Sequence, residues 1–274
     1  MSKDVFLNID EQPIESISII SDRLELRSQK GQFANFRDKY FKQMSLNDNA
    51  NILELGAGTG VIGRSYINYH KNFSGCYVVS DLSESLIKKG KFIAQKEHVN
   101  ELMKFKIIDA MVKDQIKQSF YDAVILHTLV SHVPKPEVVI FNAFHATKKN
   151  GLIVIFDADY ASLQISSGDH DLDYELNSAI KAGCVAQPYV MRNIPFIVKD
   201  LNLDLIHCNS DLLFEVQESE FFLSMAKALS SMVVKAGNLK ETTAEKWLKK
   251  IETSIKNRTF FGMCPFISYV FKVK

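Results

Sequence analysis

The sequence predicts an α/β fold with a seven-stranded, mostly parallel sheet whose last strand is antiparallel. Three observations support this prediction. A short apolar run enters a glycine-rich turn over residues 51–60. Further short apolar runs alternate with helical patterns as far as residue 157. An aromatic and β-branched run over residues 259–272 leaves no room for another crossover helix, so we expect it to lie antiparallel beside the sixth strand.

The segment before the turn, residues 1–48, is expected to form two amphipathic lid helices separated by Gly31. The second helix would either cover one edge of the sheet or close over a ligand. The apolar residues that repeat at near-helical spacing are Ile14, Ile17, Ile20 and Leu24, and then Phe33, Phe36, Tyr40 and Met44.

The glycine-rich turn is the first candidate binding element. Gly56, Gly58 and Gly60 leave the backbone without side chains, so a flat or charged group can approach closely. A helix that begins near Val61 would point its N-terminal amides at the same place, which favours a polar or anionic group. Glu54 places a carboxyl group directly before the turn.

Polar side chains stand at the ends of the predicted parallel strands. Helices are expected between these strands, among them residues 84–97 and a helix from Pro136 to the stop signal Asn150-Gly151. Ligands bind outside the carboxyl ends of strands in such sheets, so the strand ends should converge on one crevice. The five strands end at Gly56, Asp81, Asp109, His127 and Asp157.

The second half of the chain is less regular. Residues 158–200 carry helical patterns interrupted by Pro195, and residues 203–216 predict the sixth strand. Helices are expected at about 218–236 and 241–256. We expect these helices to be insertions on the substrate side of the sheet.

Composition excludes several classes of protein. The net charge is +1 and the basic residues are scattered, so nucleic acid is not expected as a partner. No apolar run reaches the ~18–20 residues of a membrane span, and the N-terminus shows no signal-peptide pattern, so we expect a cytoplasmic protein without a membrane partner. The four cysteines form no CxxC pair. The run Asp169, Asp171, Asp173 lacks the glycine and the closing glutamate of an EF-hand, so no metal site is predicted.

Three kinds of ligand could bind where a strand, a glycine turn and a helix follow one another. A nucleoside triphosphate would need a lysine after the last glycine, where Val61 stands. A dinucleotide is a better candidate, because residues 58–63 match GxGxxG and Asp81 lies at a suitable distance for a ribose. However, the strand ends two residues before that motif, at Gly56. S-adenosylmethionine is the third candidate.

The segment Leu53-Glu54-Leu55-Gly56-Ala57-Gly58-Thr59-Gly60 resembles the first motif of class I S-adenosylmethionine-dependent methyltransferases. The resemblance continues at residues 79–83, 108–110, 121–133 and 149–160, and the bacterial small-molecule enzymes are the most similar type. Asn150-Gly151 departs from the usual Pro-Gly-Gly or Asn-Gly-Gly in one turn. The upstream segment Arg23 to Arg27 is similar to the lead-in helices of this group.

The family resemblance implies a Rossmann-like fold and S-adenosylmethionine as cofactor. It divides residues 1–274, taken as one methyltransferase domain, into lid helices (1–48), a cofactor-binding half (49–160) and a substrate-side half (161–274). Glu54 would anchor the methionine amino group, Asp81 the ribose hydroxyls and Asp109 the exocyclic amine of adenine. The cofactor-binding set that the resemblance implies is Glu54, Gly56, Ala57, Gly58, Asp81, Leu82, Asp109, Ala110, His127 and, from the lid, Arg37.

Residues after the fourth and fifth strands are the candidates on the acceptor side. His132, His127 and Asp159 are candidate catalytic residues, with His132 a possible general base that could equally bond a loop carbonyl. Tyr160, Asp157 and His132 are candidate substrate-binding residues. Alignment of an already activated methyl group needs little further catalysis, so a general base could be absent.

The sequence therefore predicts methyl transfer to an oxygen or nitrogen of a small molecule. The alternatives are an NAD(P)-dependent oxidoreductase, an RNA or protein methyltransferase, and a non-catalytic module that retains the cofactor pocket. The acceptor and the oligomeric state stay open.

Overall fold

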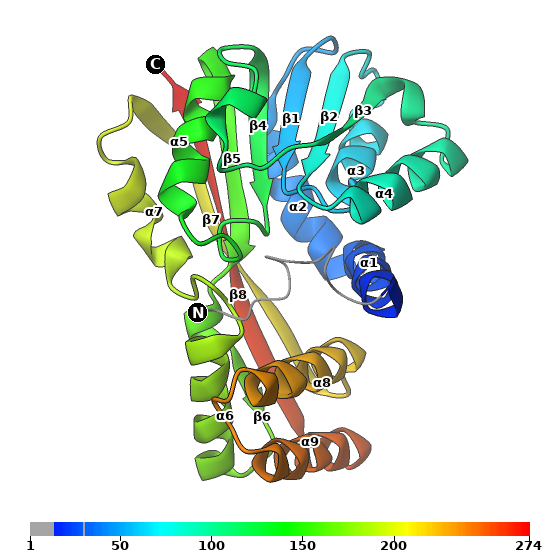
Figure 1. The fold of residues 1–274 in the computed structure, drawn as a ribbon, viewed down its shortest axis with the longest axis vertical. Coiled ribbons are helices and arrows are strands. Elements are labelled where there is room, and N and C mark those ends of the chain that lie inside the picture. The colour runs from blue at the N-terminus through cyan, green and yellow to red at the C-terminus, as the bar shows by residue number, and fades with distance from the viewer. Residues whose placement is uncertain (1–13, 30) are drawn as a thin grey trace.

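The computed structural model describes residues 14–29 and 31–274. Its centre is one sheet of eight strands in the order β3-β2-β1-β4-β5-β8-β6, with β7 also paired to β8 (Figure 1). The strands are β1 (Asn51–Leu55), β2 (Cys76–Asp81), β3 (Met103–Ile107), β4 (Tyr121–His127), β5 (Thr147–Ala158), β6 (Gln164–Ser166), β7 (Leu203–Gln217) and β8 (Phe260–Val273).

The five strands from β3 to β5 run parallel and form the half of the sheet that carries the candidate site. They are connected by α3 (Val61–Tyr69), α4 (Glu84–Lys96) and α5 (Pro136–Ala146). The chain proceeds from β1 to β2 and β3 on one side, and then β4 pairs with the other side of β1. This reversal of strand order between β1 and β4 creates the topological switch point at which ligands bind in such folds.

The antiparallel last strand is confirmed. β8 runs antiparallel to β5, β6 and β7, and it is the one described strand with that direction. It pairs with β7, the predicted sixth strand, as expected, and it also pairs with β5. The predicted count of seven strands was one too low, because β6 is only three residues long and its pairing with Phe261–Met263 gives no periodic signal.

Two helices precede the sheet, and four more surround its second half. The lid helices are α1 (Ile14–Gln29) and α2 (Gly31–Met44). In Figure 1, α8 and α9 lie beside the lower ends of β7 and β8, and α7 lies beside α5 in the upper half. The remaining helices are α6 (His170–Gly183), α7 (Val190–Val198), α8 (Glu220–Lys235) and α9 (Glu241–Lys256).

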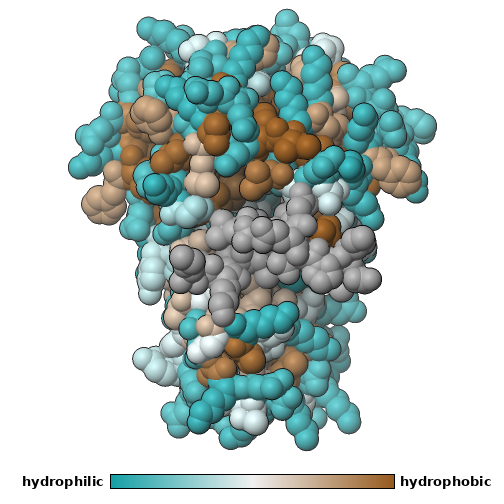
Figure 2. All heavy atoms as spheres, viewed as in Figure 1, coloured by the Kyte–Doolittle hydropathy of each residue, from teal (hydrophilic) through white to brown (hydrophobic). Residues whose placement is uncertain are grey.

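Apolar side chains form two buried clusters, one on each face of the sheet. Successive residues of β1 alternate between them, with Ile52 in one cluster and Leu53 in the other, as the pleat of a strand requires. Tyr40 of α2 and Trp247 of α9 belong to the first cluster, and Ile140 of α5 belongs to the second. The surface in the view of Figure 2 is mostly hydrophilic, with apolar residues gathered in the middle of its upper half.

The predicted end of the helix that follows Pro136 was wrong. α5 ends at Ala146, and Thr147 caps it by donating its hydroxyl to the carbonyl of Ala143. Asn150 has a φ of 64°, so Asn150-Gly151 is a turn inside β5 and not a helix stop. The end of a helix and a turn inside a strand both favour a residue in the left-handed conformation, so the sequence alone does not distinguish them.

No helix in the described part of the chain is long and apolar enough to cross a membrane.

Candidate functional site

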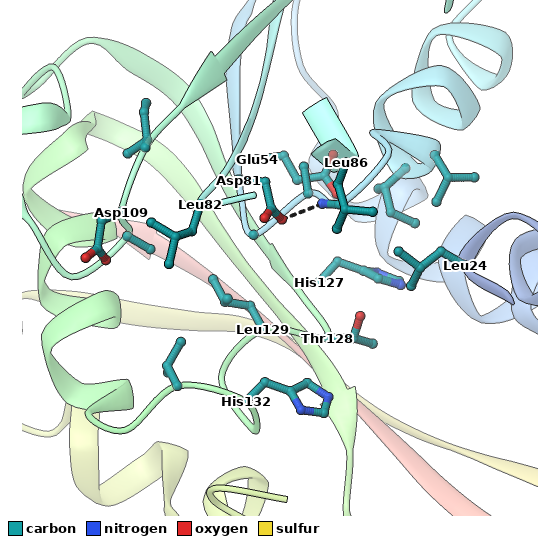
Figure 3. A pocket seen from close by; sticks show the side chains of 18 of the residues that line it. Leu24, Glu54, Asp81, Leu82, Leu86, Asp109, His127, Thr128, Leu129 and His132 are labelled. Atoms are coloured by element: carbon teal, nitrogen blue, oxygen red, sulfur yellow. Dashed lines mark hydrogen bonds between the residues drawn. The ribbon is translucent and has the colours of Figure 1, made fainter. Parts of the chain in front are cut away.

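A cavity of about 410 Å³ lies at the carboxyl ends of β1, β2 and β4, and the lid helix α1 and the segment after β3 complete it. Figure 3 shows Asp109 at one end of this cavity and Thr128 and His132 at the other. Its lining is Leu24, Arg27, Glu54, Gly56, Ala57, Gly58, Val61, Ile62, Asp81, Leu82, Leu86, Ile108, Asp109, Ala110, Met111, His127, Thr128, Leu129, His132, Val133 and Pro134.

The glycine turn forms the floor of the cavity. Gly56, Gly58 and Gly60 have φ values of 65°, 55° and 72°, a left-handed conformation that side chains disfavour. A Cβ at Gly56 would lie 2.4 Å from Cδ1 of Leu129, and one at Gly58 would lie 2.9 Å from Cδ1 of Leu24. Both glycines therefore have a backbone conformation that side chains disfavour, and an added Cβ would also require a leucine side chain to move.

Asp81 is positioned by backbone amides on both of its carboxylate oxygens. Gly58 N donates to Oδ2 at 2.7 Å, the dashed line in Figure 3, and Ser83 N donates to Oδ1 at 2.9 Å. These bonds connect the end of β2 to the glycine turn and fix the orientation of the carboxylate. A carboxylate accepts about four hydrogen bonds, so this arrangement is compatible with recognition of ligand hydroxyls.

Glu54 is buried, with 1% of its surface exposed, and still contributes to the cavity wall. The hydroxyl of Tyr77 donates to its Oε2 at 3.0 Å. Burial raises the pKa of Glu54 to about 8, although the Tyr77 hydrogen bond and the charge of Arg64 act in the opposite direction. The carboxyl group is thus ready to ionise when a cationic group comes close to it.

Asp109, Leu82 and Ala110 form the other end of the cavity. Oδ1 of Asp109 accepts from the backbone of Met111 at 2.8 Å, which closes a small turn after β3. Leu82 is 55% exposed, an unusual value for leucine, and its side chain points into the cavity (Figure 3). A flat apolar group with a polar edge would match this combination of residues.

The lid helix α1 is attached to the glycine turn by a buried ion pair. Glu25 accepts from the hydroxyl of Thr59 and from Nη2 of Arg64, while Nη1 of Arg64 donates to the carbonyl of Thr59 at 2.6 Å. Arg64 is 3% exposed. These contacts hold Leu24 and Arg27 of α1 over the cavity.

Arg37, predicted to contact the cofactor, lies outside the cavity lining. Its Nη1 donates to the carbonyl of Ser28 at 3.3 Å and thereby connects α2 to the end of α1. Arg27, and not Arg37, reaches the cavity from the lid, and its Nη2 donates to Thr128 Oγ1 at 3.1 Å.

His127 is neutral and held in place by aromatic residues. Its Nδ1 lies 2.9 Å from the Tyr40 hydroxyl, and its ring stacks on Phe156 with centroids 4.6 Å apart. Burial lowers the pKa of His127 well below the usual value, and the charges of Arg27 and Arg37 lower it further. The neutral imidazole at the end of β4 can take part in hydrogen bonds, but its lowered pKa makes it a weak base.

Of the acceptor-side candidates, His132 lines the cavity and the three residues that end or follow β5 do not. Asp157 accepts from the backbone and the hydroxyl of Ser131 and has its pKa raised by burial. Asp159 forms a two-pronged ion pair with Arg192 at 2.9–3.1 Å. Tyr160 packs edge-on against His132 with ring centroids 5.9 Å apart. The described contacts of Asp157 and Asp159 are those of residues that organise the loops.

Within the described ranges, no cluster of three or more His, Cys, Asp or Glu residues could hold a metal ion.

Several cavity residues have no role in the sequence prediction. Leu24 and Arg27 come from the lid, and Thr128, Leu129 and Val133 follow β4. Thr128 has a φ of 52°, which for a β-branched residue costs about 1–3 kcal/mol and often marks a functional site. The only sequence signal for Arg27 was its place in the segment Arg23 to Arg27, which resembled a lead-in helix without indicating a contact.

The structure has a Rossmann-like fold with a cavity that has a glycine floor and three carboxyl groups in its lining. Comparison with known families narrows the class of protein, because the family described as "Methyltransferase domain" matches residues 46–190, more than half of the chain. The chain belongs to this family of methyltransferase domains. The family predicted from the sequence is thereby confirmed.

Individual relatives are distant. The ubiquinone biosynthesis O-methyltransferase of Hydrogenovibrio crunogenus is 24% identical over 151 residues, which cover 50% of this chain and 60% of that protein. A Bacillus halodurans protein crystallised as a candidate methyltransferase has a TM-score of 0.61 at 12% identity, over 86% of this chain and 97% of its own. A geranyl diphosphate methyltransferase solved in complex with SAM has a TM-score of 0.53 at 9% identity, over 88% and 85%. At these identities the two structures support the fold alone.

Proposed function

We propose that this protein binds S-adenosylmethionine in the cavity and transfers its methyl group to an oxygen or nitrogen of a small molecule. The observation that supports this best is the row of three carboxyl groups along the cavity, Glu54, Asp81 and Asp109, next to a turn whose glycines cannot carry a Cβ. A cationic amine, two ribose hydroxyls and an adenine amine are the groups that such a row would recognise.

The residues present fit this cofactor. Gly56 and Gly58 leave backbone surface for the methionine and ribose parts, and Asp81 is oriented toward the cavity by the amides of Gly58 and Ser83. Leu82 and Ala110 provide apolar walls for a base beside Asp109. The protonated Glu54 would ionise beside an ammonium group.

The same geometry is less suitable for NAD. A pyrophosphate needs backbone amides of the turn as donors, but the amide of Gly58 donates to Asp81. The carboxyl groups of Asp81 and Asp109 would also repel a diphosphate.

S-adenosylmethionine, when bound, supplies a methyl group activated by a positively charged sulfur. The protein then needs to align the acceptor and exclude water. His127 and His132 both line the cavity at the β4 end. Because burial and two arginines lower the pKa of His127, His132 is the candidate that could take a proton from an acceptor hydroxyl. Leu24 and Leu129 close the apolar part of the cavity above the turn.

A small acceptor is favoured by the lid and by charge. Helix α1 covers the cavity through Leu24 and Arg27, which leaves limited room for a macromolecule. A net charge of +1 does not favour RNA. The relative named for ubiquinone biosynthesis is an O-methyltransferase, which supports oxygen as the acceptor atom.

A labelling experiment tests this proposal. The protein is incubated with methyl-labelled S-adenosylmethionine and a cell extract that has been separated into small-molecule, RNA and protein fractions. Label that appears in the small-molecule fraction, and is lost in the Asp81→Ala variant, supports the proposal. Label that appears only in RNA or protein contradicts it.

A further inference from the structure

Arg27 is a partly buried cation that the described residues leave without a counter-charge. Its contacts are the hydrogen bond to Thr128 Oγ1 at 3.1 Å and the Phe33 ring, whose centroid lies 5.8 Å from the guanidinium carbon. A guanidinium carries five N–H donors, and a hydroxyl accepts from one of them here. Within residues 14–29 and 31–274, Arg27 forms no ion pair with a carboxylate.

Burial lowers the pKa of Arg27, and the nearby acidic groups of Tyr160 and Asp157 partly offset this effect. Asp157 is the carboxyl group that acts on Arg27 electrostatically, but Asp157 is fully buried and is bonded to Ser131 and to the backbone of Ala158. A second guanidinium, that of Arg37, acts on the same imidazole of His127 as Arg27 does. The region thus holds two guanidinium groups and one buried carboxyl group, and a buried charge without a bonded partner of opposite charge is unfavourable unless a ligand compensates it.

Arg27 lies at the β4 end of the cavity, opposite Asp109, where the methionine part of the cofactor and the acceptor would meet. Its partner Thr128 directly follows His127 at the end of β4, whereas the carboxyl groups proposed to bind the cofactor follow or end β1, β2 and β3. Figure 3 shows Thr128 and Asp109 at opposite ends of the cavity. The left-handed backbone of Thr128 holds its hydroxyl toward Arg27 at a cost in stability, which suits a site that orients a ligand.

We propose that Arg27 binds an anionic group of the methyl acceptor, a carboxylate or a phosphate, so that the acceptor is an anionic small molecule. This inference rests on the proposed function. Arginine is suited to the task because its planar donors match a carboxylate or phosphate in a two-pronged geometry. Thr128 would add a hydroxyl donor to the same anion.

The methionine carboxylate of the cofactor offers the same chemistry, so the experiment must separate the two sources. Isothermal titration calorimetry first measures the affinity of S-adenosylhomocysteine and of 5′-methylthioadenosine, which lacks the amino-acid part. The proteins are the wild type, Arg27→Gln, Arg27→Lys and the control Arg258→Gln, whose exposed ion pair with Glu218 lies outside the cavity. Benzoate, inorganic phosphate and the neutral benzamide are then titrated into each protein saturated with S-adenosylhomocysteine.

The proposal expects the wild type and Arg258→Gln to bind benzoate or phosphate at least about tenfold more tightly than benzamide. Arg27→Gln should lose this preference and Arg27→Lys should keep part of it, with the affinity for S-adenosylhomocysteine unchanged. No preference in the wild type, or the same preference in Arg27→Gln, would overturn the proposal. It would also be overturned if Arg27→Gln weakened S-adenosylhomocysteine but not 5′-methylthioadenosine, because Arg27 would then bind the cofactor.

The two levels of failure can be told apart. Absence of S-adenosylhomocysteine binding by the wild type contradicts the proposed function and this inference with it. Intact binding without anion preference contradicts only the role of Arg27.

Discussion

The backbone amide of Gly58 donates a hydrogen bond of 2.7 Å to Oδ2 of Asp81. This contact joins the glycine turn after β1 to the end of β2. One bond therefore orients the turn and the carboxylate of Asp81 relative to each other in the proposed ribose site. Phosphate-binding turns use such amides for the ligand itself. In this protein the amide positions a carboxylate, which we propose accepts hydrogen bonds from the ribose hydroxyls.

Replacement of Asp81 should therefore weaken cofactor binding. We expect Asp81→Ala and Asp81→Asn to reduce the affinity for S-adenosylhomocysteine by about 50-fold, because hydrogen bonds to a charged group contribute about 1.5–3 kcal/mol. Asp81→Asn keeps an acceptor for a backbone amide and separates ligand recognition from loop geometry. The matched control is Asp204→Ala, which removes an exposed carboxylate paired with Lys274. Unchanged affinity in both Asp81 variants would refute the assignment.

Glu54 should make the stability of the protein depend on pH. The pKa of Glu54 is raised from 4.5 to about 8 in the folded state, so the folded protein binds more protons than the unfolded chain between these values. The contribution of Glu54 is fully present below its unfolded pKa and is lost as the pH rises through about 8. Its slope is at most about 1.4 kcal/mol per pH unit.

Urea unfolding of the wild type and Glu54→Gln at pH 5.5 and 8.5 measures this effect. The amide of Gln can still accept from the Tyr77 hydroxyl but does not ionise. Between pH 5.5 and pH 8.5, the free energy of unfolding of Glu54→Gln should rise by about 2 kcal/mol or more relative to that of the wild type. An equal change in the free energy of unfolding of both proteins between the two pH values would show that Glu54 does not titrate in this range.

The glycine turn offers a matched pair of substitutions. Gly56 and Gly168 both have left-handed backbones, but a Cβ at Gly56 would meet Leu129 at 2.4 Å and one at Gly168 would meet nothing within 4 Å. We expect Gly168→Ala to cost about 1–2 kcal/mol of stability for the backbone alone. Gly56→Ala should reduce the stability by more than this and should also weaken the binding of S-adenosylhomocysteine. Equal costs with equal affinities would mean that close approach at Gly56 has no role.

The ion pair that attaches the lid is a fourth target. Glu25→Gln removes the charge that faces Arg64, and α1 should then dock less firmly over the cavity. We expect the Kd of S-adenosylhomocysteine to rise about tenfold, which corresponds to about 1.4 kcal/mol. The control Glu252→Gln breaks an exposed pair with Lys227 between α8 and α9. Faster proteolysis within residues 14–29 should accompany the loss of affinity in Glu25→Gln alone.

The sequence predicted the parts of the site that depend on the ends of strands. Asp81, Asp109 and His127 follow apolar runs, and parallel pairing brings the ends of such runs together without further information. The interpretation of Asp157 as a residue of the site used the same logic, but its side chain turns toward Ser131. The direction of a side chain after a strand depends on the loop that packs against it.

The residues that the sequence did not reveal depend on long-range packing. Arg27 reaches the cavity only because Glu25 attaches α1 to Thr59 and Arg64, contacts that span more than 30 residues of sequence. Helical periodicity predicted α1 but did not show which residues of this helix face the cavity. The same reason explains why the sequence analysis expected Arg37, and not Arg27, to reach the cavity.

The central claim is that the cavity binds S-adenosylmethionine, and calorimetric titration of the wild-type protein tests it most directly. S-adenosylhomocysteine, NAD and NADP are titrated separately into the protein at neutral pH. The account predicts saturable, one-to-one binding of S-adenosylhomocysteine and no saturable binding of either dinucleotide. Saturable binding of NAD or NADP without a response to S-adenosylhomocysteine would contradict it.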